Sequence, residues 1–226
     1  MDIETLPDLE KFMLSKIHSL NNKFEKYFKK YDFHNLYKEL LNFCTTDLSA
    51  FYFDIRKDTL YCDPINSEKR KSCVTILNVL LKSLLRWFAP ILSFTTEEIH
   101  QLISKNIKSI HLEKFLTFPD KFKNEQLTER WSQLIKIRDV CNISIEEKRA
   151  NKEIGSSLEA ELKIKLNEKY KDIISKIDLS ELCIVSKTQI NFDEGSDILV
   201  ETKKAPGDKC PVCWKISVEP CKRHPQ

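Results

Sequence analysis

The C-terminal residues have the spacing of a metal site. Two residues separate Cys210 from Cys213, and two separate Cys221 from His224. Ligands at this spacing can turn both side chains onto one ion, and two such pairs complete a tetrahedron. Thiolates, with or without an imidazole, favour zinc over calcium or magnesium. The pattern therefore predicts one zinc ion bound by these four side chains.

The predicted zinc ion has a structural role. The tail contains prolines and little apolar volume, so the metal would have to supply its folding energy. A catalytic zinc usually keeps an open position beside three protein ligands and has an acid nearby, which this pattern does not suggest. Two alternatives stay open: loose cysteines prone to disulfide formation, and water or another residue in place of His224.

The composition restricts the location and the chemistry. The chain has 226 residues, a net charge of +3 and only three glycines, none of them clustered, so a phosphate-binding glycine loop is excluded. Residues 74–92 are too polar to span a membrane, and the acidic start lacks a secretory signal. We expect a cytoplasmic protein in which the other five cysteines are small core residues: Cys44, Cys62, Cys73, Cys141 and Cys183.

Most of the chain has the periodicity of amphipathic helices. The predicted helices cover 6–29, 33–51, 68–88, a short stretch from Thr95 or Thr96, and 124–151. Asp32 and Ser67 are predicted caps, and Ala89-Pro90 is predicted to end or kink the third helix. Trp87 and Trp131 fall on apolar stripes and are predicted core residues.

The pattern changes after Gly155. Leu162, Ile164 and Leu166 alternate with polar residues, which predicts a half-buried strand. A short helix over 168–176 and extended segments around 182–185 and 198–201 follow. The sequence predicts a mainly α chain in three domains: a helical bundle (1–153), a small α/β junction (154–204) and a zinc module (205–226).

Six strings spread over nearly the whole chain form a recognisable series: Tyr31 to His34, Phe43-Cys44, Phe51 to Asp58, Arg86 to Thr95, Gly155 to Ala160 and Lys209 to Trp214. In this order they resemble the C-terminal region of bacterial isoleucyl-tRNA synthetases. The chain departs from that family in its tail, which usually ends the metal site with a second Cys-x-x-Cys pair after a longer insert. Here the spacing is short and His224 takes the place of the last cysteine.

The resemblance implies a helical anticodon-binding domain, a small α/β junction and a zinc module that together bind isoleucine tRNA. Neither a His-x-Gly-His nor a Lys-Met-Ser-Lys-Ser string is present. The chain is therefore expected not to activate isoleucine itself, ATP being used by the family's catalytic domain. The implied partners are isoleucine tRNA and the catalytic body of the same synthetase, with the chain itself a monomer.

Candidate RNA contacts combine aromatic or guanidinium stacking with phosphate-binding cations. Beside the predicted zinc site they are Trp214, Lys209, Lys215, Lys222 and Arg223; elsewhere they are Arg86, Arg138, Lys148, Arg149 and Lys152. Each has an alternative: Trp214 could cap the knuckle, the arginines could be paired internally, and the lysines could be an ordinary solvated surface.

Two functions of other classes remain. A zinc-dependent interaction module without catalysis would dock on a protein through exposed helices and show little salt-sensitive RNA affinity. A zinc hydrolase would need an open metal position and metal-dependent turnover.

Overall fold

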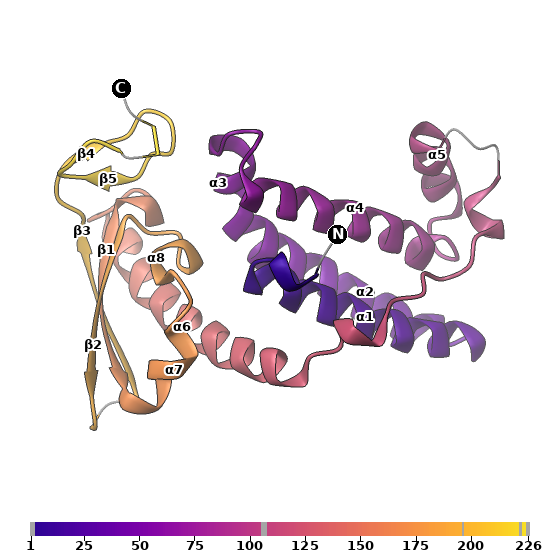
Figure 1. Ribbon diagram of the computed structural model, residues 1–226, viewed down its shortest axis with the longest axis horizontal. Helices are drawn as coiled ribbons and strands as arrows, with labels where there is room; N and C mark the ends of the chain where they lie inside the picture. The colour runs from indigo at the N-terminus through magenta and orange to yellow at the C-terminus, as the bar shows by residue number, and fades with distance from the viewer. Residues whose placement is uncertain (1–2, 105–107, 196, 222, 225–226) are drawn as a thin grey trace. The chain divides into compact units, whose positions relative to one another are not determined.

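The computed structural model describes residues 3–104, 108–195, 197–221 and 223–224, and divides into two compact units. The first comprises Met1–Leu60 and Pro64–Thr128, and the second comprises Tyr61–Asp63 and Glu129–Gln226. Figure 1 labels the helices and strands of both units.

Three helices form the body of the first unit: α1 (Asp8–Lys29), α2 (Phe33–Asn42) and α4 (Glu68–Phe88). Both predicted caps are confirmed. The Asp32 side chain accepts a hydrogen bond from the Asn35 amide at 3.3 Å, and the Ser67 hydroxyl accepts one from the Arg70 amide at 3.4 Å. These bonds satisfy amide donors that a helix start leaves without partners.

Between α2 and α4 the helical backbone continues further than the sequence pattern indicates. A π-helical segment, η2 (Phe43–Phe53), follows α2 without a break, and α3 (Asp54–Cys62) continues it. The predicted α-helical end at Phe51 is therefore wrong. The wider winding of a π-helix disturbs the 3.6-residue pattern on which that prediction rested. The helical run ends directly before Asp63-Pro64, as expected for a residue that precedes proline.

The short helix α5 (Ser93–Ile103) begins two or three residues before the predicted start at Thr95 or Thr96, so Glu97 lies in its second turn. The Glu97 carboxylate accepts hydrogen bonds from the Ser109 hydroxyl at 2.8 Å and the Ile110 amide at 2.9 Å. The Ser109 bond is the main reason why the pKa of Glu97 lies below its usual value. Glu97 thus holds the start of the 3-10 turn η3 (Ile110–Leu112). A second 3-10 turn, η4 (Asp120–Phe122), follows before the next long helix.

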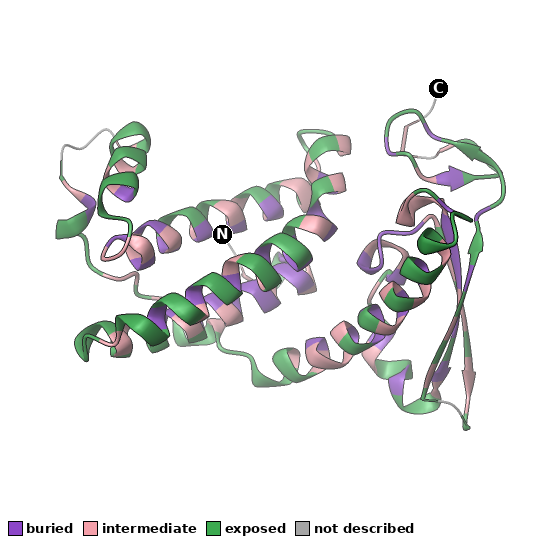
Figure 2. Ribbon diagram, turned by 180° about the vertical axis from the view of Figure 1, so that it is seen from behind, coloured by how far each residue is buried: buried purple, intermediate pink, exposed green. Residues whose placement is uncertain are grey.

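The core of the first unit lies on the inner faces of these helices (Figure 2). Trp87 is fully buried, as predicted, and its ring meets those of Phe24 and Phe43 edge-on at centroid distances of 5.0 and 5.9 Å. The indole Nε1–H donates to Asn21 Oδ1 at 3.0 Å. A buried tryptophan therefore has both apolar packing and a hydrogen-bond acceptor.

A buried ion pair crosses the same core. Arg56 donates from Nε to Glu10 Oε1 at 2.6 Å and from Nη2 to Glu10 Oε2 at 2.7 Å. The two residues are 3% and 0% exposed. The Tyr52 hydroxyl lies 3.4 Å from Glu10 Oε1, so the carboxylate is hydrogen-bonded on more than one side. Such pairing is what a charge removed from water requires.

The second unit contains a three-stranded sheet in the order β2-β1-β3. The strand β1 (Ala160–Asn167) is central; β2 (Lys187–Asp193) pairs parallel to it and β3 (Ile198–Lys204) antiparallel. Leu162, Ile164 and Leu166 are fully buried, which confirms the predicted strand. Short helical turns connect the strands: η5 (Ser157–Glu159), η6 (Glu168–Tyr170), α7 (Lys171–Ile174) and α8 (Leu179–Leu182).

The predicted extended segment around 182–185 is wrong, because α8 ends at Leu182 and a turn follows. The Asp178 carboxylate caps α8 by accepting the Ser180 and Glu181 amides at 2.8 and 3.4 Å. A run of four apolar residues is compatible with either a buried helical turn or a buried strand. The capping residue Asp178 is therefore the more informative signal.

The long helix α6 (Glu125–Ala150) holds the sheet unit together through polar bonds to later segments. Arg130 Nε donates to the Ile173 carbonyl at 2.8 Å, and Arg138 Nε donates to the Leu182 carbonyl at 3.0 Å. The Ser144 hydroxyl lies 2.7 Å from that of Thr202 on β3. Figure 1 shows α6 alongside the sheet.

The mainly α class with a small α/β unit is confirmed. The boundaries at 153/154 and 204/205 stay predictions, since compact units and domains are different divisions of a chain. Among the described residues, no helix is both long and apolar enough to span a membrane.

Candidate metal centre and nucleic-acid interface

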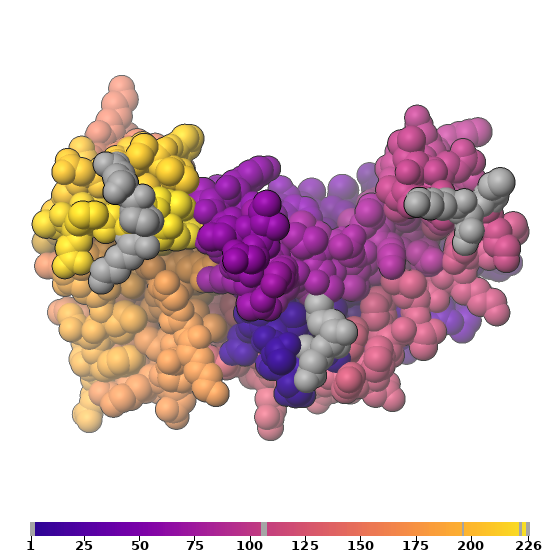
Figure 3. All heavy atoms as spheres, turned by 45° about the horizontal axis from the view of Figure 1, so that its top comes forward, coloured from indigo at the N-terminus to yellow at the C-terminus, as the bar shows by residue number. Residues whose placement is uncertain are grey.

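A tight two-stranded hairpin carries the first pair of predicted ligands. Its strands are β4 (Asp208–Lys209) and β5 (Ile216–Ser217), paired antiparallel. Gly207 precedes them with a φ of 108°, and a Cβ atom there would lie 2.2 Å from the Ser217 carbonyl carbon. Glycine is therefore required at this position on two grounds, the backbone angle and the close approach. Figure 3 shows the C-terminal atoms, in yellow, packed together rather than extended.

Between the two strands the chain forms a turn that brings the cysteine side chains together. The Cys210 amide donates to the Lys215 carbonyl at 2.9 Å, and the Trp214 amide donates to the Cys210 carbonyl at 3.0 Å. Trp214 has a φ of 63°, in the left-handed region that non-glycine residues seldom adopt. These bonds turn Cys210 and Cys213 toward the same point.

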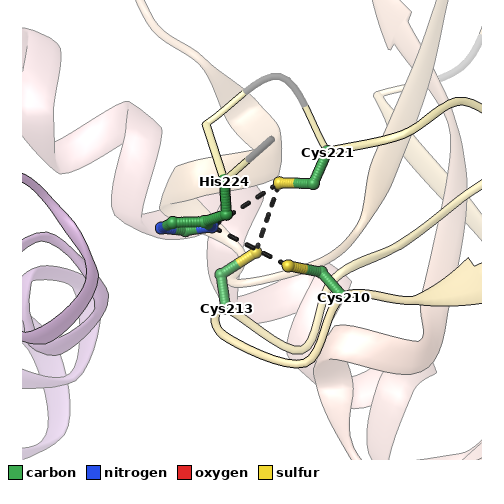
Figure 4. A group of neighbouring side chains, drawn as sticks. All are labelled: Cys210, Cys213, Cys221 and His224. Carbon is green, nitrogen blue, oxygen red and sulfur yellow. Dashed lines mark hydrogen bonds between the residues drawn. The ribbon is translucent and has the colours of Figure 1, made fainter. Parts of the chain in front are cut away.

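The four predicted ligands lie together (Figure 4). Their ligand atoms, three Sγ atoms and His224 Nδ1, are all within 4.8 Å of one another. The Cys213 and Cys221 sulfurs are 3.8 Å apart, and His224 Nδ1 lies 3.6 Å from the Cys221 sulfur and 3.8 Å from the Cys210 sulfur. The four side chains that the sequence spacing singled out therefore form one cluster.

These distances fit a tetrahedral ion. Zinc–sulfur and zinc–nitrogen bonds of ordinary length place two sulfurs about 3.8 Å apart and a sulfur and a nitrogen about 3.6 Å apart. A disulfide would need sulfurs about 2.05 Å apart, and all the cysteines are free thiols. The cluster could therefore hold a metal ion, and the loose-disulfide alternative is not the arrangement seen.

The pKa values of the thiols favour binding of a cation to this cluster. The Cys213 amide, hydrogen-bonded to the Cys210 sulfur, is the largest of the influences that lower the pKa of Cys210 to about 6. Burial, together with the Cys210 and Cys221 thiols, raises the pKa of Cys213 to about 12. One thiolate is therefore stabilised by the fold, whereas neighbouring thiolates oppose further ionisation. A divalent cation would remove that opposition, because thiolates are its ligands.

His224 is oriented by a residue far away in the sequence. Its Nε2 atom lies 3.0 Å from the backbone carbonyl oxygen of Cys62, which belongs to the same compact unit. A carbonyl oxygen only accepts, so Nε2 carries a hydrogen and Nδ1 is the ring nitrogen that faces the sulfurs. Metal-bound histidines usually have such a second partner. The sequence spacing did not predict Cys62.

Four of the predicted RNA contacts are at least partly exposed: Trp214, Lys209, Lys215 and Lys152. Trp214 is 59% exposed, and Lys209 Nζ lies 5.4 Å from its ring centroid and 4.0 Å from Glu159 Oε1. Lys215 is half-buried and Lys152 is exposed, the latter with a φ of 60°. The indole is therefore accessible with a cation beside it. The alternative in which Trp214 caps the knuckle fits this exposure poorly.

The other predicted contacts have partners within their own unit. Arg138 is 8% exposed and bonds to the Leu182 carbonyl, and Arg86 bonds to Glu113 and to the Lys82 and Lys114 carbonyls. Lys148 pairs with Glu153 and Arg149 with Glu146, while Arg223 pairs with Asp63. RNA would have to compete with these bonds. Lys222 lies outside the described residues.

The helical part of the chain matches a known family. The model for the anticodon-binding domain of tRNA ligases matches residues 10–165, from α1 into β1. The chain belongs to the family of tRNA-ligase anticodon-binding domains. The predicted resemblance is confirmed. The six sequence motifs on which it was based lie in the helical part of the chain, at the start of the α/β unit and in the tail.

Curated relatives extend the similarity of this anticodon-binding domain chain to its C-terminus. It is 59% identical to the isoleucine–tRNA ligase of Pelagibacter ubique over 99% of its own length and 25% of that protein. It is 37% identical to that of Bartonella henselae and 36% identical to that of Agrobacterium fabrum, over 94% and 95% of its length and 23% of theirs. The chain thus spans about a quarter of these relatives, and the cysteine tail, beyond residue 165, lies within the region aligned to Pelagibacter ubique.

Proposed function

We propose that the chain recognises the anticodon of isoleucine tRNA as the C-terminal part of an isoleucine–tRNA ligase, whose catalytic body charges the tRNA with isoleucine using ATP. The observation that carries the proposal is the match of residues 10–165 to an anticodon-binding domain, in a chain 59% identical to an isoleucine–tRNA ligase. Its contribution is binding energy that positions the tRNA, and it acts in the cytoplasm as a monomer.

A structural zinc ion at Cys210, Cys213, Cys221 and His224 is the second part of the proposal. The distances and the thiol chemistry support it. When bound, zinc would join two segments of a tail that has little apolar volume. Four protein ligands leave no position for substrate, so a hydrolase is disfavoured.

The RNA contacts that we propose are those with accessible groups. Trp214 would stack on an unpaired anticodon base, because every base has a face that an exposed indole can cover. Lys209 and Lys215 flank it and would neutralise phosphates, and Lys152 would do the same beyond the end of α6. Lesser roles fall to the cations with shorter bonds to partners, since releasing them costs those bonds: Arg86, Arg138, Lys148, Arg149 and Arg223.

Selective binding of tRNA tests the function. The chain is titrated with isoleucine, valine and methionine tRNAs over a salt series, with and without a zinc chelator. We expect preference for isoleucine tRNA and affinity that falls steeply with salt, because cation–phosphate contacts release counterions. Chelation should weaken binding in proportion to the tail's share. Equal binding of the three tRNAs at every salt concentration would contradict the proposal.

Replacing Trp214 with alanine should weaken binding of isoleucine tRNA while leaving metal content unchanged. A base stacked on an aromatic side chain contributes about 1–3 kcal/mol, or roughly 5- to 150-fold in affinity. Trp214→Phe keeps a stacking face and should retain most of the affinity. Equal losses for alanine and phenylalanine would show that the indole is not a stacking platform.

A zinc-dependent protein-interaction module is the second candidate. The observation that favours it is the exposed apolar surface of α5, where Phe94 is 93% and Leu102 80% exposed. Such side chains are typical of surfaces covered by another protein. The salt series separates the two candidates, because an apolar protein interface lacks the steep salt dependence of RNA binding.

A further inference from the structure

The short segment Tyr61–Asp63, named here the clamp segment, reaches the metal tail in more than one place. Besides the bond between Cys62 and His224, Arg223 Nε and Nη2 lie 2.6 and 2.5 Å from Asp63 Oδ1. The Cys62 sulfur lies 3.8 Å from the carbonyl oxygen of Val212. Val212 stands between the first two ligands and Arg223 directly precedes the fourth, so the clamp segment touches both ligand pairs.

The Arg223–Asp63 pair is sheltered from water. The Asp63 side chain is 12% exposed and that of Arg223 30%. A charge-assisted bond with two donors on one carboxylate oxygen is stronger and more directional than an exposed lysine pair. It fixes the backbone next to His224, whose imidazole must lie within reach of both Cys62 and the sulfurs.

We infer that the clamp segment is the outer shell of the metal site and that Asp63 is a positioning residue for the ligand His224. The inference rests on the proposed zinc site. Asp63 holds Arg223 in place, and the neighbouring Cys62 carbonyl fixes the imidazole in the tautomer that offers Nδ1. The histidine ligand of the tail is thereby oriented by residues that lie outside the tail.

The physical reason is conformational entropy. A histidine in a short tail with little apolar packing can adopt many orientations, and ordering it on binding costs free energy. Outer-shell partners that orient a ligand beforehand reduce this cost, and their removal typically weakens metal binding about 10- to 100-fold. Metal affinity should therefore depend on an acid that is not itself a ligand.

The test compares the zinc affinity of the whole chain with that of Asp63→Asn, by competition with a chromophoric chelator. We expect one zinc per chain in both and affinity about tenfold weaker in the variant. The matched control is Glu146→Gln, which removes the same charge from a pair that Arg149 makes on the surface of the same unit. The control should bind zinc like the unaltered chain.

Arg223→Gln provides the second variant. It should weaken zinc binding as much as Asp63→Asn, and the double variant should lose no more than either single one, because both remove one interaction. If Asp63→Asn loses helical signal, Arg223→Gln alone decides. In the zinc-loaded protein, nitrogen NMR should show His224 Nε2 protonated and Nδ1 bound to metal.

The outcomes separate the inference from the zinc site on which it rests. An unaltered chain that binds no zinc overturns both. Zinc binding by the unaltered chain, with both variants within about twofold of it, overturns the positioning role and leaves the four-ligand site intact. Coordination through Nε2 would do the same, because the Cys62 carbonyl would then face the wrong nitrogen.

Discussion

Replacing Cys210 with serine is expected to release the metal and unfold only the tail, with the helices unchanged. Structural zinc in small modules binds with about 10–16 kcal/mol, so the loss of one of four ligands should weaken binding on the order of a hundredfold or more. The hairpin of the tail pairs only two residues of each strand, so its own backbone ladder stabilises it little. Zinc titration and helical circular dichroism measure the two effects separately.

Cys183→Ser serves as the control for this experiment. Cys183 is buried in the same unit but lies outside the ligand cluster, so its replacement should leave metal content unchanged. Loss of all helical signal in Cys210→Ser would refute the modular organisation. Full zinc occupancy in that variant would remove Cys210 from the ligand set.

Arg56→Met should destabilise the helical unit by about 3–5 kcal/mol, because it leaves the Glu10 carboxylate buried without its cation. Glu10 is completely buried and receives two bonds from Arg56, so water cannot replace the guanidinium without opening the core. Denaturant unfolding of the chain, followed by helical signal, measures the change.

The double variant Glu10→Leu, Arg56→Met distinguishes loss of a partner from loss of packing. Apolar residues of similar size often replace a buried pair without cost, so the double variant should recover most of the lost stability. A double variant as unstable as Arg56→Met would mean that the shape of the pair, rather than its charge, holds these helices. Lys57→Met, which removes an exposed pair with Asp54, should change stability little.

Elements with clear end signals or a regular apolar pattern were predictable from the sequence. The bounds of α4 follow from Ser67 at one end and Ala89-Pro90 at the other, and β1 follows from strict alternation. The π-helical segment was not predictable in this way. Its hydrogen bonds join residues five apart, so apolar residues on one face no longer recur with the α-helical period of 3.6. The turn after α8 was mistaken for an extended segment, because the four apolar residues from Leu182 to Val185 have no clear period.

The candidate site likewise combines features that the sequence predicts with features that it does not. Two closely spaced ligand pairs were visible in the sequence, since the contacts that form each knuckle are local. The Cys62 carbonyl was not visible, because a backbone atom leaves no trace in residue type. Asp63 was visible only as a helix terminator, and Glu10 as one more charge on an amphipathic helix. Contacts between distant residues need the fold itself.

The pairing of Asp63 with Arg223 also affects how the chain is made. The two residues are 160 positions apart, and residues 64–128 belong to the other compact unit. At a synthesis rate of about 5–20 residues per second, Asp63 leaves the ribosome roughly 8–30 seconds before Arg223 does. The helical unit can fold during that interval, whereas the clamp segment gains its contact with Arg223 only once residue 223 has been made. A metal ion held by the cluster would therefore be captured only after the helical unit has had time to fold.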